Sequence, residues 1–382
     1  MADPSARADL TKRQIPFMTL ASGLSDLPGA SLRTASATDT AESRFALPGT
    51  AVVTGGTGAI AQAVVRAMLQ HGLTGLMLLD LDVASAEAAG QIAALRGEFP
   101  EARIEAQSVD VTDEAGVAAA MERAAAALGG VDYLVCFAGV VGCVHALEMP
   151  AAQFRRILDI NTTGAFVCAQ AAARVMVRQG RGGRVVFTAS ISAHRVNFPQ
   201  PQAAYNTSKG ALLQLKSSLA AEWARYGITV NSISPGYMDT VLNEGEGLRE
   251  AREVWAGRNP AGRMGMPEEV GGVVVMLCSR AGSYFNGSDL VVDGAVLFSR
   301  GVGGCVGGYG LLRGTVSRER QATIDTRGEE FEMPVKAFLI RVPSPLSKRS
   351  GPCGRFSTDA LCQEEPSITT SLVVAPVWMH PK

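Results

Sequence analysis

Three side chains in one stretch of the sequence are suited to moving a proton to or from an alcohol. Ser190 follows the apolar run Val185–Phe187, which has the pattern of a buried strand. Tyr205 and Lys209 stand four residues apart, a spacing that places both on one face of a helix. A free tyrosine has a pKa near ~10, and a nearby ammonium lowers that pKa. Tyr205 then suits a general acid or base, with Ser190 bonding the substrate oxygen.

A tyrosine and a lysine at this spacing also occur on solvated helix faces, so the surrounding elements must decide between the two interpretations. Apolar strands alternate with helical patterns along the chain. Strands are expected at Thr50–Thr54, Leu76–Leu79, Ile104–Val109, Val131–Gly139, Val185–Phe187, Ile228–Gly236 and Ser288–Gly294. This alternation predicts an α/β fold, a Rossmann-type doubly wound parallel sheet forming a single domain. Ligands of such sheets bind at the carboxyl ends of the strands.

A glycine-rich turn follows the first expected strand. Gly56–Ala61 reads GxGxxA and leads into an amphipathic helix, which is the context of a pyrophosphate-binding turn. Asp80 ends the second expected strand, where a carboxylate accepts hydrogen bonds from ribose hydroxyls and repels a 2′-phosphate. This position favours NAD over NADP, with NADP kept as possible. The alternative is that Asp80 or Asp82 caps the next helix.

The composition restricts the partners and the compartment. The chain has 382 residues and a net charge of −1, which gives no reason to expect nucleic acid or an anionic membrane as partner. No apolar run reaches the ~18 residues of a membrane span. The seven cysteines form no CxxC pair, which favours a reducing, cytoplasmic location. The four histidines are scattered, so no metal site is expected.

The two ends of the chain lack the strand–helix rhythm. Residues 1–48 are rich in small and polar residues and are expected to form a disordered leader before the domain at 49–298. Residues 299–382 begin with a glycine-rich run and are expected to be a disordered, dispensable extension. The alternative is a regulatory or partner-binding tail, with Phe338–Val342 as a possible short strand.

Together these residues resemble the short-chain dehydrogenase/reductase (SDR) family, over roughly Thr50 to Gly294. The resemblance implies NAD(P)(H)-dependent interconversion of a secondary alcohol and a ketone, with Tyr205 as acid/base. Lys209 would bind the nicotinamide ribose and lower the pKa of Tyr205, Ser190 would position the carbonyl, and Asn161 would order a water. From the residues alone, Asn161 is either a structural hydrogen-bonding post or part of a proton path. The implied cofactor contacts are Gly55, Thr57, Gly58, Ile60, Asp80, Asp110, Val111, Ala138, Gly139, Tyr205, Lys209, Pro235, Gly236, Met238 and Thr240.

Three features depart from the family pattern. Ala59 and Ala61 stand where the family usually has glycines. Cys136 and Phe137 replace two asparagines that would bear hydrogen-bonding groups near the cofactor. The chain also continues well past the Asp293-Gly294 segment, where family members usually end.

Within the family, the stretch from Arg195 to Thr240 is most similar to fungal polyol dehydrogenases, which interconvert sugar alcohols such as sorbitol, mannitol or arabitol with ketoses. Ketoreductases of secondary-metabolite pathways have similar cores and are the alternative. A different class, a non-catalytic dinucleotide-binding scaffold, is also kept. The resemblance further implies a homodimer or homotetramer through the helix carrying Tyr205 and its neighbour.

Substrate choice is expected to depend on three loops, at Val140–His145, His194–Gln202 and Tyr237–Trp255. Four side chains in the middle loop either hydrogen-bond a polyol or are ordinary loop residues: His194, Asn197, Gln200 and Gln202.

Overall fold

The computed structural model describes residues 16–20, 34–240, 248–298, 321–324 and 330–333, the last two ranges by their backbone only. The chain forms two units, Met1–Cys305 and Val306–Lys382. The first unit contains every predicted catalytic and cofactor residue.

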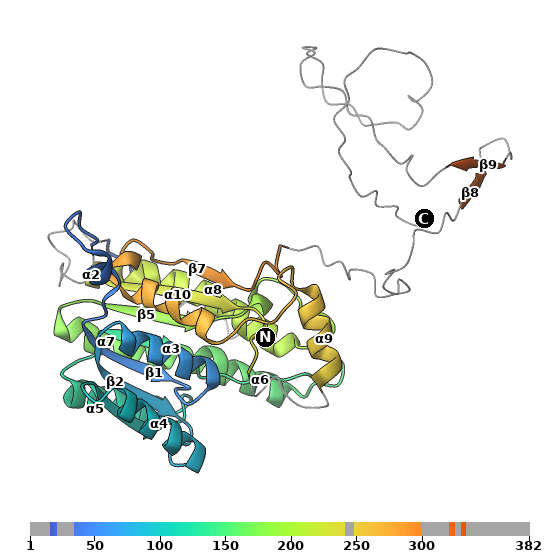
Figure 1. Ribbon diagram of the computed structural model, residues 1–382. Helices are drawn as coiled ribbons and strands as arrows, with labels where there is room; N and C mark the ends of the chain where they lie inside the picture. The colour runs from blue at the N-terminus through green and yellow to red at the C-terminus, as the bar shows by residue number, and fades with distance from the viewer. Residues whose placement is uncertain (1–15, 21–33, 241–247, 299–320, 325–329, 334–382) are drawn as a thin grey trace. The chain divides into compact units, whose positions relative to one another are not determined.

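A parallel sheet of seven strands forms the centre of the first unit, in the order β3-β2-β1-β4-β5-β6-β7 (Figure 1). Each neighbouring pair is parallel. The chain runs outward from β1 to β3, returns to the centre, and runs outward again from β4 to β7. This confirms the predicted doubly wound fold. The strands are β1 Gly49–Thr54, β2 Leu73–Asp80, β3 Arg103–Ser108, β4 Tyr133–Cys136, β5 Gly183–Thr188, β6 Ile228–Pro235 and β7 Asp289–Val292.

Helices cover both faces of the sheet because the central strands are apolar on both sides. On β1, Val52 belongs to one core cluster and Ala51 and Val53 to the other, as the two-residue period of a strand requires. The first cluster lies under α5 Glu114–Leu128, α7 Gly164–Gln179 and α8 Ala203–Trp223; the second lies under α3 Ala59–Gln70, α4 Ala86–Glu98 and α10 Glu268–Cys278.

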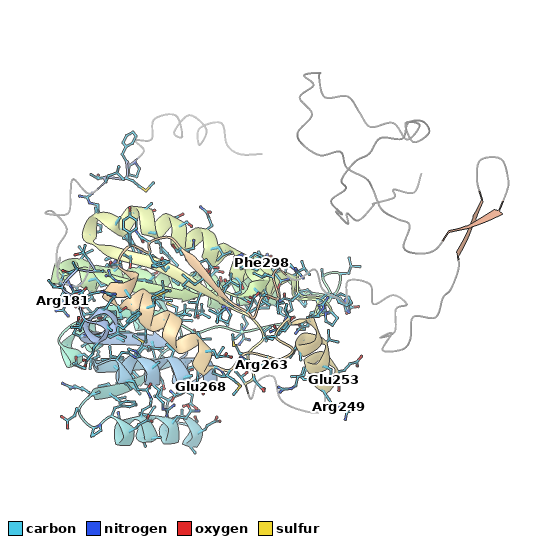
Figure 2. All side chains as sticks on the ribbon, turned by 45° about the horizontal axis from the view of Figure 1, so that its top comes forward. Arg181, Arg249, Glu253, Arg263, Glu268 and Phe298 are labelled. Atoms are coloured by element: carbon cyan, nitrogen blue, oxygen red, sulfur yellow. The ribbon has the colours of Figure 1, made fainter. Side chains whose placement is uncertain are left out.

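The carboxyl ends of the strands meet at one edge. In register, Thr54 pairs with Cys136 and Cys136 with Phe187, so the ends of β1, β4 and β5 are neighbours. Within the first unit, helix α9 Arg249–Arg258 lies at the end opposite Arg181, which stands two residues before β5 (Figure 2). Helix α6 Ala151–Leu158 and the π turn η3 Asp159–Thr163 lead into α7.

The amino-terminal boundary of the domain lies earlier than predicted. Thr40 caps the short helix α2 Ala41–Phe45, and Leu47 is fully buried in the core. Asp39 forms an ion pair with Arg280 at 2.6 Å. Residues 34–48, which the sequence assigned to a disordered leader, are therefore folded, and the helix cap, the buried Leu47 and the ion pair of Asp39 hold the segment. Residues 1–15 and 21–33 lie outside the described structure.

The second unit contains one antiparallel pair, β8 Gln321–Ile324 with β9 Glu330–Met333. These strands fall within the extension expected to be disordered, and the character of that extension as a whole stays a prediction. The possible strand at Phe338–Val342 lies outside the described residues.

Candidate active site

Strand β5 and helix α8 bring together the hydroxyl, the phenol and the amine. Ser190 follows β5 and caps the short helix η4 Ile191–Ala193, where its Oγ accepts from Ser192 N at 3.1 Å. Tyr205 and Lys209 both lie on α8. Lys209 Nζ donates to the Thr188 carbonyl at 2.6 Å and stands 5.7 Å from the centre of the Tyr205 ring. The three groups therefore share one rim.

Burial dominates the electrostatics of this rim. Desolvation raises the pKa of Tyr205, while a hydrogen bond with Ser190 opposes that rise. Desolvation also lowers the pKa of Lys209 to about 8, because a buried site disfavours an ammonium. The expected lowering of the Tyr205 pKa by Lys209 is therefore not the main effect here. The phenol keeps its proton at neutral pH and is ready to act as an acid.

Asn161 lies in the π turn η3, buried beside α8. Its Oδ1 accepts from Val140 N at 2.8 Å, and its Nδ2 donates to the Val140 carbonyl and to Ser208 Oγ, each at 2.9 Å. A π turn widens a helix locally and often marks a functional site. These contacts agree with the interpretation that Asn161 is a structural hydrogen-bonding residue. Its role in ordering a water stays a prediction.

The glycine-rich loop packs against the end of β4. Gly55 has a φ of 63°, and a side-chain carbon there would stand 2.6 Å from Ala138 N. Only glycine fits such a conformation at that distance. A carbon added at Gly139 would stand 3.6 Å from Lys209 Nζ. These distances place Gly55 against Ala138 and place Gly139 near Lys209, so the Ala138-Gly139 segment lies between the loop and the amine.

The amino end of α3 is open toward this edge. Its cap residue, Gly58, is extended and provides no side-chain hydrogen bond. The first N–H groups of a helix carry partial positive charge and bind phosphate when no cap occupies them. Ile60 and Thr57 are half-buried beside the turn. The residues present therefore fit the pyrophosphate of a dinucleotide.

Asp80 holds the same loop from the end of β2. Its Oδ2 accepts from Thr57 N at 2.9 Å and from Thr57 Oγ1 at 2.6 Å, and its Oδ1 accepts from Leu81 N. The following helix, α4, is capped instead by Ser85, whose Oγ accepts from Ala88 N. The capping alternative for Asp80 is thus wrong.

The turn after β3 carries the next predicted contacts. Val109 N donates to the Asp80 carbonyl at 2.7 Å, which places this turn beside Asp80. Asp110 is exposed and accepts from Thr112 N and Oγ1, hydrogen bonds that lower its pKa. Val111 is buried against the first turn of α7, where a carbon added at Gly164 would touch it.

The segment after β6 carries the last predicted contacts. Gly236 N donates to the Val292 carbonyl, and a carbon added at Gly236 would stand 2.9 Å from Asp293. Met238 is buried and pairs with Gly265 in a parallel bridge, and Thr240 is buried. All four residues of this group, Pro235 included, lie at the carboxyl edge of the sheet.

Two of the four loop side chains considered for substrate contact have their side-chain nitrogens bonded to oxygens of the fold. His194 Nε2 lies 3.0 Å from Asp289 Oδ2 and 3.1 Å from Ser234 Oγ. Asn197 Nδ2 donates to Ser192 Oγ at 2.6 Å. Both side chains already have strong oxygen partners, so they stabilise the segment that carries Ser190.

Tyr237 is a site residue that the sequence did not single out beyond its loop. Its ring stacks on Trp255 with centroids 4.6 Å apart and an interplanar angle of 10°. Burial raises the pKa of Tyr237 to about 12, and Tyr205 and Cys143 add to the rise, so both lie close by. The sequence carries only one signal for this pair, an aromatic residue at each end of the third loop.

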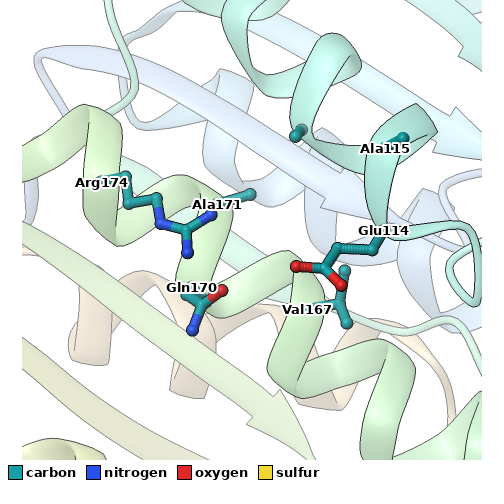
Figure 3. A pocket seen from close by; sticks show the side chains of 7 residues that line it. Glu114, Ala115, Val167, Gln170, Ala171 and Arg174 are labelled. Atoms are coloured by element: carbon teal, nitrogen blue, oxygen red, sulfur yellow. The ribbon is translucent and has the colours of Figure 1, made fainter.

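A surface groove elsewhere on the domain is not part of this site. It lies between α5 and α7, and Glu114 and Arg174 border it (Figure 3). The described part of the chain contains no cluster of three or more possible metal ligands. Among those same residues, no helix has the length and apolar character needed to cross a membrane.

Comparison with known proteins identifies the class. A family model described as enoyl-(acyl carrier protein) reductase matches residues 56–296. The chain belongs to the short-chain dehydrogenase/reductase family, whose members bind NAD or NADP.

Several curated relatives are named as polyol dehydrogenases. Galactitol 2-dehydrogenase (L-tagatose-forming) of Cereibacter sphaeroides is 40% identical over 246 residues, which is 64% of this chain and 93% of that protein. D-arabinitol 2-dehydrogenase (ribulose-forming) of Scheffersomyces stipitis is 34% identical over 256 residues, 64% and 92% of the two chains.

Solved structures agree with the fold. A gluconate 5-dehydrogenase from Burkholderia cenocepacia, in complex with NADP and tartrate, superposes with a TM-score of 0.62 at 29% identity, covering 68% of this chain and 100% of that one. A short-chain type dehydrogenase/reductase from Mycobacterium marinum has the same TM-score, 0.62, at 38% identity, covering 66% and 97%.

Proposed function

We propose that this protein is an NAD(P)(H)-dependent dehydrogenase that interconverts a polyol and the corresponding ketose, with Tyr205 as the acid/base. One observation carries the proposal: Ser190, Tyr205 and Lys209 share a rim, and the Ala138-Gly139 segment lies between Lys209 and the uncapped loop of α3. A binding scaffold would need the loop but not the three reactive groups. The polyol class is supported by the names of relatives at 34–40% identity.

Each residue of the rim has a different role in proton transfer. When bound, the dinucleotide supplies hydride exchange at the nicotinamide. Tyr205 gives a proton to the substrate oxygen in reduction and takes it back in oxidation. Ser190 donates a hydrogen bond to the same oxygen and stabilises the charge that develops there. Lys209 stabilises the phenolate when Tyr205 is deprotonated, and Asn161 keeps the neighbouring loop and α8 in place.

The loop of α3 and its surroundings would hold the dinucleotide. The amino end of α3 would hold the pyrophosphate, Asp80 would bind the adenosine ribose, and the segment after β6 would bind the nicotinamide amide. The carboxylate of Asp80 favours NAD, because a 2′-phosphate would meet its negative charge. The other contacts that we assign are Gly55, Thr57, Gly58, Ile60, Asp110, Val111, Ala138, Gly139, Pro235, Gly236, Met238 and Thr240.

A substrate panel tests the proposal. Galactitol, D-arabinitol, mannitol and sorbitol are offered with NAD and with NADP, beside aromatic ketones with each reduced cofactor, and absorbance of the reduced cofactor is followed. We expect polyol oxidation with NAD, and an Asp80→Ala variant that loses much of its preference for NAD over NADP. Turnover of aromatic ketones alone would favour a secondary-metabolite ketoreductase. Cofactor binding without any turnover would favour a scaffold.

The same proposal covers assembly and location. Helix α8 presents several faces, and its neighbour α7 borders the open groove of Figure 3, so a homodimer or homotetramer through these helices is proposed. The described cysteines Cys136, Cys143, Cys168 and Cys278 are free thiols, which supports work in the cytoplasm.

A further inference from the structure

The segment between η4 and α8 carries two glutamines, Gln200 before Pro201 and Gln202 after it. Gln200 Oε1 accepts from the Tyr237 hydroxyl at 2.9 Å. Gln202 Nε2 donates to Cys143 Sγ at 3.3 Å, and Gln202 is only 6% exposed. Each glutamine therefore joins this segment to one of the other two loops that were expected to decide substrate choice.

The loop that carries Cys143 is fixed at both ends. Val140 is bonded through its N and O to the side chain of Asn161. Val144 N donates to the Pro201 carbonyl at 3.0 Å. Cys143 stands between these anchors and is exposed, so the loop forms a wall that runs from the predicted tetrad to the start of α8.

The second wall is aromatic and rigid. Tyr237 stacks on Trp255, which is 2% exposed, and the Tyr237 hydroxyl is held by Gln200. Gln200 bonds Tyr237, Gln202 bonds Cys143, and α8 with Tyr205 in its first turn begins directly after Gln202, so the two walls and the phenol of the rim lie in one neighbourhood.

The two glutamine amides keep hydrogen-bonding capacity that the fold does not use. A thiol sulfur is a weak acceptor, so a ligand hydroxyl displaces it from Gln202 Nε2 at little cost. Within the part of the chain that the structure describes, the NH₂ group of Gln200 makes no hydrogen bond. His194 and Asn197 differ in this respect, because the side-chain nitrogen of each already lies at hydrogen-bond distance from a side-chain oxygen of the fold.

We infer that Gln200 and Gln202 are the specificity-determining residues that bind the non-reacting hydroxyl groups of a polyol chain, between the Cys143 wall and the Tyr237 wall. The inference rests on the proposed function. A site built to hydrogen-bond a substrate hydroxyl discriminates strongly against an analogue without it, because its polar groups are then left unpaired.

Kinetics of methionine variants test the inference, since methionine keeps the length of glutamine and removes the amide. We compare Gln200→Met and Gln202→Met, using D-arabinitol and 2-butanol as substrates. The ratio of kcat/KM for D-arabinitol to that for 2-butanol should fall about 10- to 100-fold in each variant, the factor for one or two lost hydrogen bonds. Gln214→Met, on the exposed face of α8, is the matched control and should keep the wild-type ratio. A ratio that stays at the wild-type value in both site variants would overturn the inference.

A labelling experiment separates this inference from the proposed function. Wild type with cofactor is treated with iodoacetamide, with and without D-arabinitol, and alkylation of Cys143 is measured by peptide mass spectrometry. The polyol should slow alkylation severalfold in wild type and much less in Gln202→Met. Unchanged alkylation in wild type would contradict the binding site even if polyols are oxidised. Protection without any oxidation would instead reject the proposed function and leave the binding site supported.

Discussion

At the scale of single residues, Lys209 is the most constrained group of the site. It is 5% exposed, and its ammonium is held by one backbone carbonyl, that of Thr188. Burying a cation with so little compensation is costly for the fold and is usually tolerated only where function needs the charge. Replacing Lys209 should therefore change the free energy of unfolding of the protein.

Replacing Lys209 with methionine should change how stability depends on pH. Because the folded pKa of Lys209 is about 8 and the unfolded value is 10.5, the unfolded chain binds more protons in that interval. The contribution of Lys209 to the unfolding free energy thus rises by about 1.4 kcal/mol per pH unit there. Lys209→Met should be the more stable protein at pH 7, and its advantage should shrink between pH 8 and pH 10. Urea unfolding at several pH values measures this difference; a constant difference would contradict the burial of the charge.

The sequence predicts some of the site residues and not others, for a physical reason. The spacing of Tyr205 and Lys209 and the turn at Gly55 are local patterns, so a helix or a tight turn places them without knowledge of the rest. The pairs Gln202–Cys143 and Gln200–Tyr237 join loops far apart in the chain, and only the packed fold decides them. The same holds for Asp80, which binds Thr57 instead of capping the helix beside it.

At the scale of elements, the packing of α10 on α3 supports the glycine-rich loop, because α3 begins at that loop. Gly271 is buried at this contact, and a carbon added there would stand 2.8 Å from Ala67 Cβ. Its neighbour Gly272 is exposed with no atom within 4 Å of an added carbon. The strand and helix order was predictable from periodicity, whereas this close approach of two helices was not.

These two glycines form a matched pair of tests. Alanine favours a helix over glycine by about 0.5–1 kcal/mol at either position. At Gly272 nothing opposes that gain, so Gly272→Ala should stabilise the protein by about that amount. At Gly271 the added methyl forces the helices apart, at a cost of about 1–3 kcal/mol. Denaturant unfolding of both variants should rank Gly271→Ala clearly below Gly272→Ala. Equal stabilities would mean that the two helices do not pack as described.

At the scale of the whole molecule, the first unit contains the complete candidate site and both core clusters. Its last described residues are tied to the domain: Asp293 accepts from Ala295 N and Leu297 N, and Arg195 donates to the Leu297 carbonyl. Composition predicted a domain boundary at this point, which stays a prediction, but it did not predict that residues 34–48 fold, because Phe45 and Leu47 stand among small and polar residues.

Truncation after Phe298 should therefore leave a working domain. The shortened chain keeps every contact named above, so its thermal midpoint should stay within about 4 °C of the full chain, the shift expected for a change near 1 kcal/mol. Its kcat should match that of the full chain. Loss of the folded, active protein would assign the extension a role in stability or assembly.

The claim on which the account depends is that the Tyr205 hydroxyl exchanges the proton of the substrate. Its most direct test is kcat for the best polyol of the panel in wild type and Tyr205→Phe, with cofactor affinity measured on both. We predict that kcat falls about 10²- to 10⁴-fold, the usual contribution of a positioned acid/base, while the cofactor binds nearly as before. Turnover at the wild-type rate without the hydroxyl would contradict the account.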